Sequence, residues 1–367
     1  MTTRQEASGP EDDASRNAAE ALLSRRDGLV DAVVTREFSR RPQLRDRFGD
    51  EAEARSREDA GYHLAYLAEA VRQGNRDLFV DYLGWAKVVL ARRSVSGDDL
   101  AFHLGIAREV IGESLNARHG GPVLSVLDHG LQRLPDLPEE VPTLIEPDHP
   151  HAAMAHQYLQ TLLRGDRQTA SRLVMEAAER GIPVKELYLH VFQRTQHEVG
   201  RLWQSNLISV AQEHYCTAAT QLIMSRLYPW VFGGERSGRT LVATCVSGDL
   251  HELGVRMVAD FFEMEGWDTI YLGANTPSAS VVEMVRDRRP DVLAVSATIL
   301  HHVPEVEALI RQVRADLGDT VPMILVGGYP FNLDGELWRK VEADGHGRDA
   351  DEAIALASRL VGKEGPR

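Results

Sequence analysis

Strand-like and helix-like segments alternate over the last third of the chain, and this alternation limits the possible folds more than any other feature. Apolar, β-branched runs predict buried strands, and the longer segments between them have helical periodicity. We expect strands at 240–247, 268–272, 291–297 and 322–326, and helices between and after them at 252–265, 278–288 and 303–316. The alternation predicts a doubly wound, Rossmann-like parallel sheet with right-handed crossovers.

The loop after the first predicted strand has the sequence Asp249-Leu-His251-Glu-Leu-Gly254. Open α/β sheets bind ligands at the carboxyl ends of their strands. Asp249 can accept a hydrogen bond from one ring nitrogen of His251, as carboxylates do for metal-bound imidazoles, and Gly254 lets a bulky group approach the backbone. A metal ligand at His251 is therefore one interpretation. The alternative is a loop histidine that caps the next helix, in whose first turn Glu252 is expected to be a helix acid.

Length and charge narrow the class of protein. A chain of 367 residues can form two or three domains with their own cores. The 41 basic and 55 acidic residues leave a formal charge of −14, which disfavours direct binding of nucleic acid or of an anionic membrane. No run of eighteen apolar residues and no charged-then-apolar leader occurs, so we expect neither a membrane span nor a signal peptide. The two cysteines lie in apolar segments, which favours a cytoplasmic location.

Composition and periodicity divide the chain into five parts. We expect a disordered tail at 1–17, an N-terminal helical domain at 18–134, a proline-rich linker at 135–150, a four-helix bundle at 151–230 and the sheet domain at 231–367. The bundle helices are predicted at 152–164, 167–180, 183–204 and 210–227.

Aromatic and basic side chains recur at helical spacing in the N-terminal helical domain. The set comprises His63, Tyr66, Tyr82, Trp85, Arg92 and Arg93. One interpretation is a helical core with a basic end, because aromatic stripes usually pack. The other is a slot for a flat conjugated ligand whose carboxylates pair with the arginines.

Three short motifs fall at the carboxyl ends of predicted strands, as one binding crevice requires. They are Asp249-x-His251-x-x-Gly254, Ser296-Ala-Thr298 and Gly327-Gly328. Gly254 and Ser296 are separated by 41 residues, and Thr298 and Gly327 by 28. This pattern resembles the signature of cobalamin-binding domains and extends across the whole predicted sheet. Thr298 departs from the leucine that many members have there.

The resemblance implies a role for each motif. His251 would be the lower axial ligand of cobalt and Asp249 would orient it. The nucleotide tail of the cofactor would run between Ser296 and the glycine pair. The chemistry agrees, since imidazole suits a borderline transition metal and glycines let a tail pass a strand end.

A second pattern lies in the predicted bundle, where Trp203 is followed after nine residues by Glu213-His214. It is similar to the signature of adenosylcobalamin-dependent photoreceptors, which implies that Trp203 and Glu213 pack on the adenosyl group. The light-dependent repressors of that group have a histidine directly after the tryptophan, whereas this chain has Gln204. His197 or His214 is then the candidate for an upper ligand after photolysis. The N-terminal region has no recognisable helix-turn-helix, so the chain is not expected to be a repressor itself.

The order of these parts resembles the photocobilins, which bind adenosylcobalamin and biliverdin in one chain. The resemblance implies a light sensor that is not an enzyme, with an output through a light-dependent homo-oligomer or an unknown protein partner. Both cysteines lie outside the N-terminal domain, so biliverdin there would be held non-covalently. A corrinoid subunit of a methyltransferase system and a light-independent cobalamin sensor remain the alternatives.

Other histidines carry weaker signals. His149, His151 and His156 have metal-like spacing but no cysteine or acid in step, which disfavours zinc. His301-His302 follow the third predicted strand, where they can line the crevice or cap the next helix.

Overall fold

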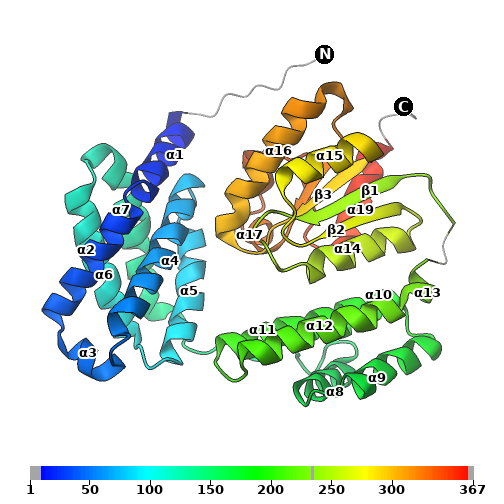
Figure 1. Cartoon of the computed structure of the whole chain (residues 1–367), viewed down its shortest axis with the longest axis horizontal. Coiled ribbons are helices and arrows are strands. Elements are labelled where there is room, and N and C mark those ends of the chain that lie inside the picture. The colour runs from blue at the N-terminus through cyan, green and yellow to red at the C-terminus, as the bar shows by residue number, and fades with distance from the viewer. Residues whose placement is uncertain (1–9, 233–234, 363–367) are drawn as a thin grey trace. The chain divides into compact units, whose positions relative to one another are not determined.

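The computed structural model describes residues 10–232 and 235–362, with side chains from residue 13 onward (Figure 1). The chain separates into two compact units, Met1–Val141 and Pro142–Arg367. Each unit is described by itself. No helix within the described residues is long and apolar enough to cross a membrane.

The first unit is helical throughout its described part. Its helices are α1 (Pro10–Leu23), α2 (Arg26–Arg40), α3 (Gln43–Phe48), α4 (Ala52–Arg72), α5 (Asp77–Ala91), α6 (Gly97–Ser114) and α7 (Ala117–Arg133), followed by the 3₁₀ turn η1 (Leu134–Asp136). Pro42, Gly74 and Ser96 all lie between helices. Ser96 forms a capping box with Asp99 at the start of α6.

One N-terminal expectation needs correction. Helix α1 begins at Pro10, so residues 10–17 are helical rather than a disordered tail, while residues 1–9 lie outside the described part of the chain. The last long helix of this unit, α7, continues to Arg133 with Pro122 inside it. The Asn116 side chain accepts a hydrogen bond from the His119 N–H at 3.1 Å, which starts this helix.

Much of the predicted linker 135–150 is fastened to its own unit. The buried Lys87 ammonium donates to the carbonyl of Leu137 at 2.6 Å in the first unit. In the second unit, the Leu144 N–H donates to the buried Glu198 carboxylate at 2.8 Å. The proline-rich stretch is therefore held on both sides of the boundary between Val141 and Pro142.

The second unit begins with the expected bundle. Its helices are α8 (Ala152–Leu163), α9 (Arg167–Glu179), a long third helix made of α10 (Val184–Glu186), the π-helical η2 (Leu187–Gln193) and α11 (Arg194–Gln204), then α12 (Val210–Arg226) and the short α13 (Tyr228–Val231). These lie where the sequence predicted four helices. The π-helical turn was not predicted, because it leaves the apolar periodicity of the third helix almost unchanged.

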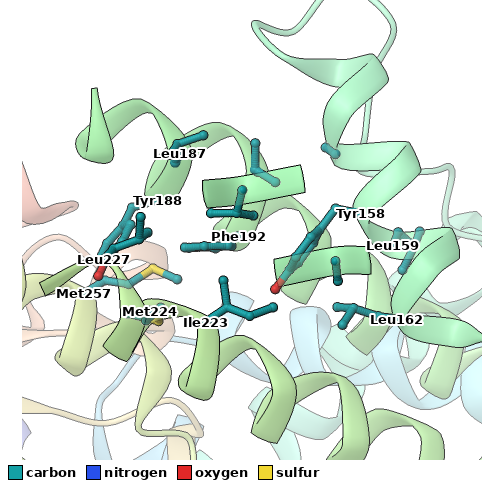
Figure 2. Packing of buried hydrophobic residues seen from close by; sticks show 14 of the residues in the cluster. Tyr158, Leu159, Leu162, Leu187, Tyr188, Phe192, Ile223, Met224, Leu227 and Met257 are labelled. Carbon is teal, nitrogen blue, oxygen red and sulfur yellow. The ribbon is translucent and has the colours of Figure 1, made fainter. Parts of the chain in front are cut away.

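The bundle core continues into the sheet domain. Figure 2 shows Tyr158, Phe192 and Ile223 packed between the bundle helices, with Met257 at one end of the cluster. Met257 and the fully buried Phe261 belong to α14 (Leu253–Met264), which packs on the sheet. The bundle core therefore includes side chains of the sheet domain's α14, whereas the strands have a second core cluster that includes Leu241 and Phe262.

The sheet has the predicted parallel, doubly wound architecture. Its strands are β1 (Thr240–Cys245), β2 (Asp268–Gly273), β3 (Val292–Ser296), β4 (Met323–Gly327) and β5 (Gly345–His346), in the order β2-β1-β3-β4-β5. The helices that follow α14 are α15 (Ser278–Arg288), α16 (Val303–Leu317), α17 (Tyr329–Leu333), α18 (Leu337–Lys340) and α19 (Ala350–Val361), with the 3₁₀ turns η3 (Leu300–His302) and η4 (Gly318–Thr320).

The strand order places a topological switch point between β1 and β3. The chain leaves β1 for β2 on one side and then returns to form β3 on the other, and all neighbours are parallel. Ligands of such sheets bind where the carboxyl ends of the strands diverge at this point. The loops after β1 and β3 are therefore expected to form the ligand site.

Candidate functional site

The loop after β1 is fixed by the loop after β2. The Gly248 N–H donates to the Asn275 side-chain oxygen at 2.8 Å, and the Asn275 N–H donates to the Asp249 carbonyl at 2.9 Å. Asn275 has a φ of 51°, in the left-handed region that asparagine tolerates better than most residues. Asn275 thus holds the histidine loop in place. The role of Asn275 was not predicted, because the sequence shows only an asparagine just past the end of a strand.

Asp249 and His251 form the pair that the sequence predicted. One Asp249 oxygen accepts from the His251 Nδ1 at 2.8 Å and from the His251 N–H at 3.0 Å. Asp249 is fully buried, whereas the His251 side chain is 57% exposed. The Asp249 bond raises the pKa of His251. Nδ1 is therefore the held nitrogen, and Nε2 is the ring atom left to bind a metal.

The second oxygen of Asp249 ties in the loop after β3. It accepts from the Thr298 N–H at 2.6 Å, and the His302 Nδ1 lies 3.6 Å away. Burial would raise the pKa of Asp249, but hydrogen bonds from the His251 ring and the backbone, together with the nearby His302 ring, outweigh burial and hold the pKa of Asp249 well below its usual range. From the sequence, His302 could line the crevice or cap the next helix; the structure places it beside Asp249.

The remaining sheet residues of the motif lie at neighbouring strand ends, where Ser296 pairs with Gly327. Gly328 has a φ of 106°, and a Cβ there would lie 2.0 Å from the Ala297 carbonyl oxygen, so the protein's own packing requires glycine. A Cβ at Gly254 would meet no protein atom within 4 Å. The space in front of Gly254 is therefore left open by the chain.

Glu252 has a larger role than the expected helix acid. Its carboxylate accepts from the Gln221 side-chain amide at 2.6 Å, from the Tyr271 hydroxyl at 2.8 Å and from the Ala274 N–H at 3.0 Å. It therefore joins helix α12 of the bundle to strand β2 and the loop after it. These partners are 31, 19 and 22 residues away along the chain, so no local pattern indicates them.

The bundle presents its predicted residues where α11 ends and α12 begins. Trp203 remains 40% exposed. The Glu213 carboxylate accepts from the Thr217 hydroxyl at 3.0 Å and also bonds the ring of the exposed His214. The charge of Glu213 adds to the rise in the pKa of His251, so this carboxylate lies near enough to act on the ring from the bundle side. Glu213 of the bundle motif thus lies near the histidine loop, as does Gln221 through its bond to Glu252.

The ring residues predicted in the first unit also lie together. The Tyr66 and Tyr82 rings stack with centroids 3.9 Å apart, and the Tyr82 and Trp85 centroids lie 5.9 Å apart. The buried His63 Nδ1 and the Tyr82 hydroxyl are hydrogen-bonded at 2.7 Å, and burial holds the pKa of His63 well below its usual value. Trp85 is the exposed end of this stack.

The two arginines of that set follow the end of α5. Arg92 pairs with Glu140 at 3.1 Å, and the charge of Arg93 acts on the partly buried Asp59. Both arginines are exposed. Core packing accounts for His63 and Tyr82, while Trp85 and the arginines remain at the surface.

No group of three or more metal-ligating side chains is preassembled within residues 10–232 and 235–362. His149 and His151 instead pair with glutamates, Glu146 at 3.5 Å and Glu186 at 2.8 Å. Among the described residues, a metal at His251 would thus meet a single imidazole of the chain. Such a site suits a metal whose other ligands come with it, as the ring nitrogens of a corrin do.

The residues at the sheet edge fit that kind of cofactor. The exposed His251 ring directs a free nitrogen outward, its other nitrogen is fixed by a buried carboxylate, and Gly254 leaves open space beside it. Fold and site together define a cobalamin-binding module. Residues 239–355 match the B12 binding domain model, and residues 154–228 match a second model also described as B12 binding domain. The chain therefore carries both the sheet and the helical part of such a module.

Individual relatives support the same class. The chain is 23% identical to Corrinoid protein DSY3155 of Desulfitobacterium hafniense, over 56% of this chain and 95% of that protein. It is 26% identical to Trimethylamine corrinoid protein 2 of Methanosarcina mazei, over 52% and 88% of the two chains. A shorter match, 34% identical, covers 24% of this chain and 31% of the HTH-type transcriptional repressor CarA of Myxococcus xanthus.

A solved structure has the same fold as this module. The monomethylamine corrinoid protein of Methanosarcina barkeri matches with a TM-score of 0.52 at 18% identity, over 57% of this chain and all of that chain. The predicted Rossmann-like fold with an associated helical bundle is confirmed. A cobalamin cofactor is supported by both domain models and by these relatives.

Proposed function

We propose that this protein is a light-sensing signalling protein that binds adenosylcobalamin. His251 would be the lower ligand of cobalt, and Trp203 and Glu213 would contact the adenosyl group. Two observations carry the proposal: Trp203 near the end of α11 is 40% exposed, and the charge of Glu213 in the first turn of α12 adds to the rise in the pKa of His251. A methyl group needs neither an indole surface nor a hydrogen-bond acceptor, whereas an adenosyl group uses both.

When bound, adenosylcobalamin supplies a cobalt–carbon bond that light can break. The chain's own residues would do the rest. Asp249 would keep the His251 ring oriented, and Trp203 and Glu213 would contact the adenosyl group. The Glu252 to Gln221 bond and the packing of Met257 in the bundle core link the bundle to the sheet. Repacking at this junction is the two-state element that the ligand would bias.

The first unit would bind biliverdin non-covalently. Both cysteines of the chain lie in the second unit and are buried, so a thioether link in the first unit has no thiol available. The stack of Tyr66, Tyr82 and Trp85 offers an aromatic surface, and Arg92 and Arg93 offer charges for two carboxylates. The output would be a light-dependent homo-oligomer or binding of a protein partner in the cytoplasm, with no catalytic reaction and no direct contact with DNA.

One experiment tests both chromophores. Protein produced in the dark with adenosylcobalamin and biliverdin is examined by absorbance and by size-exclusion chromatography, before and after green light. We expect absorbance bands in the green and the red, a change in the spectrum on illumination and a change in the elution volume. Identical spectra and elution volumes before and after light contradict it. Trp203→Ala should weaken adenosylcobalamin binding, while Trp230→Ala, an exposed tryptophan in α13, is the matched control.

A second candidate is a corrinoid protein of a methyltransferase system. It is favoured by the relatives named as corrinoid proteins, which the chain matches over 88–95% of their length. A stable methyl-cobalt form that a methyltransferase consumes would support it over the light sensor. A light-independent cobalamin sensor would instead change its oligomeric state on titration in the dark, with no effect of light.

A further inference from the structure

A chain of hydrogen bonds runs from the core of the bundle to Glu213. The buried Tyr158 and Thr220 hydroxyls are 3.0 Å apart, and Thr220 also accepts from the Gln196 side-chain amide at 2.9 Å. The Thr217 hydroxyl lies 3.1 Å from the Gln196 side-chain oxygen and 3.0 Å from a Glu213 oxygen. The chain joins helices α8, α11 and α12, and it ends on the carboxylate assigned to the upper ligand.

The orientation of the Gln196 amide follows from its neighbours. Its nitrogen lies 3.4 Å from the Cys216 carbonyl oxygen, which can only accept a hydrogen bond. The NH₂ group must therefore face Cys216 and Thr220, and the amide oxygen must face Thr217. Gln196 is thus an acceptor at the end nearer to Glu213.

The Thr217 hydroxyl then has two acceptors and one hydrogen. Gln196 and an ionised Glu213 both need that hydrogen, and a hydroxyl can give it to only one of them. When Thr217 donates to Glu213, the nearer Glu213 oxygen is fixed and keeps one lone pair free; when Thr217 donates to Gln196, that oxygen loses this donor. The other Glu213 oxygen is engaged by His214. A hydroxyl of the ligand that reaches Glu213 would donate to the lone pair of the carboxylate oxygen that no protein group occupies.

We infer that Thr217 and Gln196 are positioning residues that adapt Glu213 to an upper ligand bearing hydroxyl groups. Thr217 holds the carboxylate in place by donating to one of its oxygens, whose second lone pair can still accept from the ligand. Gln196 competes for the same hydrogen, so a ligand hydroxyl compensates Glu213 whenever Thr217 donates to Gln196. The pair favours an adenosyl group, whose ribose has hydroxyls, over a methyl group, which has no donor. This inference rests on the proposed function.

The test compares affinities for two cobalamins in the dark. The full chain and its variants are titrated with adenosylcobalamin and, separately, with methylcobalamin, and binding is followed by absorbance. Thr217→Val removes the hydroxyl at constant shape, and Thr217→Ser restores it. Thr195→Val is the control, because Thr195 is a fully buried threonine of the same bundle, whereas Thr217 is partly buried, and the Thr195 hydroxyl donates to the Ala155 carbonyl at 3.4 Å, away from Glu213.

Thr217→Val should weaken adenosylcobalamin binding by about fivefold to tenfold, the range for one lost hydrogen bond to a charged group after partial compensation. Its affinity for methylcobalamin should be unchanged, which also shows that the variant folds. Thr217→Ser and Thr195→Val should match the wild type. If Thr217→Val does not fold, the affinities of Thr217→Ala for the two cobalamins give the same comparison.

Different outcomes would contradict the proposed function and the positioning role of Thr217. A wild type without preference for adenosylcobalamin overturns the proposed upper-face contacts, and this inference with them. A wild-type preference that Thr217→Val and Thr217→Ala retain overturns the positioning role alone. An equal loss of affinity for both cobalamins means that Thr217 is merely structural, which also overturns it.

Discussion

Replacing Asp249 by asparagine tests how the protein holds its metal-binding histidine. The carboxylate is fully buried and accepts three close hydrogen bonds, from the His251 ring and N–H and from the Thr298 N–H. Asparagine has the same shape but one acceptor oxygen, and its NH₂ group cannot accept. One side of the site must therefore lose its partner, whichever way the amide turns.

The size of the effect follows from these bonds. If the amide oxygen stays with His251, the NH₂ group faces the Thr298 N–H, and one hydrogen bond to a charged group is lost, worth about 1.5–3 kcal/mol. If the amide turns around, His251 loses the acceptor that fixes its ring. Loss of such an acceptor lowers metal affinity by about 10–100-fold. We therefore expect Asp249→Asn to destabilise the second unit by about 2 kcal/mol and to weaken cobalamin binding about tenfold or more.

Urea unfolding and cobalamin titration measure the two effects. Electron paramagnetic resonance of the cobalt(II) form, with ¹⁵N-histidine in the protein, reports whether an imidazole of the chain is still the axial ligand. Asp287→Asn, an exposed aspartate on α15, is the matched control. Unchanged stability together with unchanged affinity in Asp249→Asn would refute the role assigned to the carboxylate.

Three further substitutions have definite expected outcomes. Gly254→Ala should leave the melting temperature of the cofactor-free protein unchanged or raise it, because the added Cβ meets no atom within 4 Å. Gly254→Leu should abolish cobalamin binding in a titration. Tight binding by Gly254→Leu would show that the cofactor does not use the space in front of Gly254. Burial raises the pKa of Asp260, which accepts from the Tyr188 hydroxyl, to about 6. The folded state holds this proton more tightly than the unfolded state, so this contribution to stability is present below pH 4 and is lost as the pH rises through 6. Asp260→Asn should therefore exceed the wild type in urea unfolding at pH 8, by up to about 3 kcal/mol, and a gain of the same size at pH 4 would contradict this. Lys87→Met should destabilise the first unit by about 2–4 kcal/mol, because three carbonyls lose one buried donor; an unchanged unfolding curve would disprove the anchoring role.

Local patterns were enough to place most helices and strands. The strands β1 to β4 and the bundle helices lie where periodicity predicted them, because a buried strand or an amphipathic helix is defined by the residues within it. The prediction failed where a short-range signal misled. Residues 10–17 are polar but helical. The two-residue strand β5 is too short to have a pattern of its own.

The motif residues of the candidate site were also visible in the sequence. Asp249 precedes His251 by two residues, so a single turn of loop brings the carboxylate to the ring. The sequence shows the pair Gly327-Gly328, but only the structure shows which of the two positions requires glycine. A Cβ at Gly328 would collide with Ala297, while one at Gly327 would approach no nearer than 3.5 Å to Gly347.

The partners that complete the site depended on tertiary structure. Asn275 reaches the histidine loop because β2 pairs with β1, and His302 reaches Asp249 because β3 lies on the other side of β1. Thr217 and Gln196 meet because α11 and α12 pack against each other. Periodicity and motif spacing describe a residue's own segment. Which distant segment supplies its hydrogen-bond partner is decided by sheet order and helix packing, which arise only when the whole core forms.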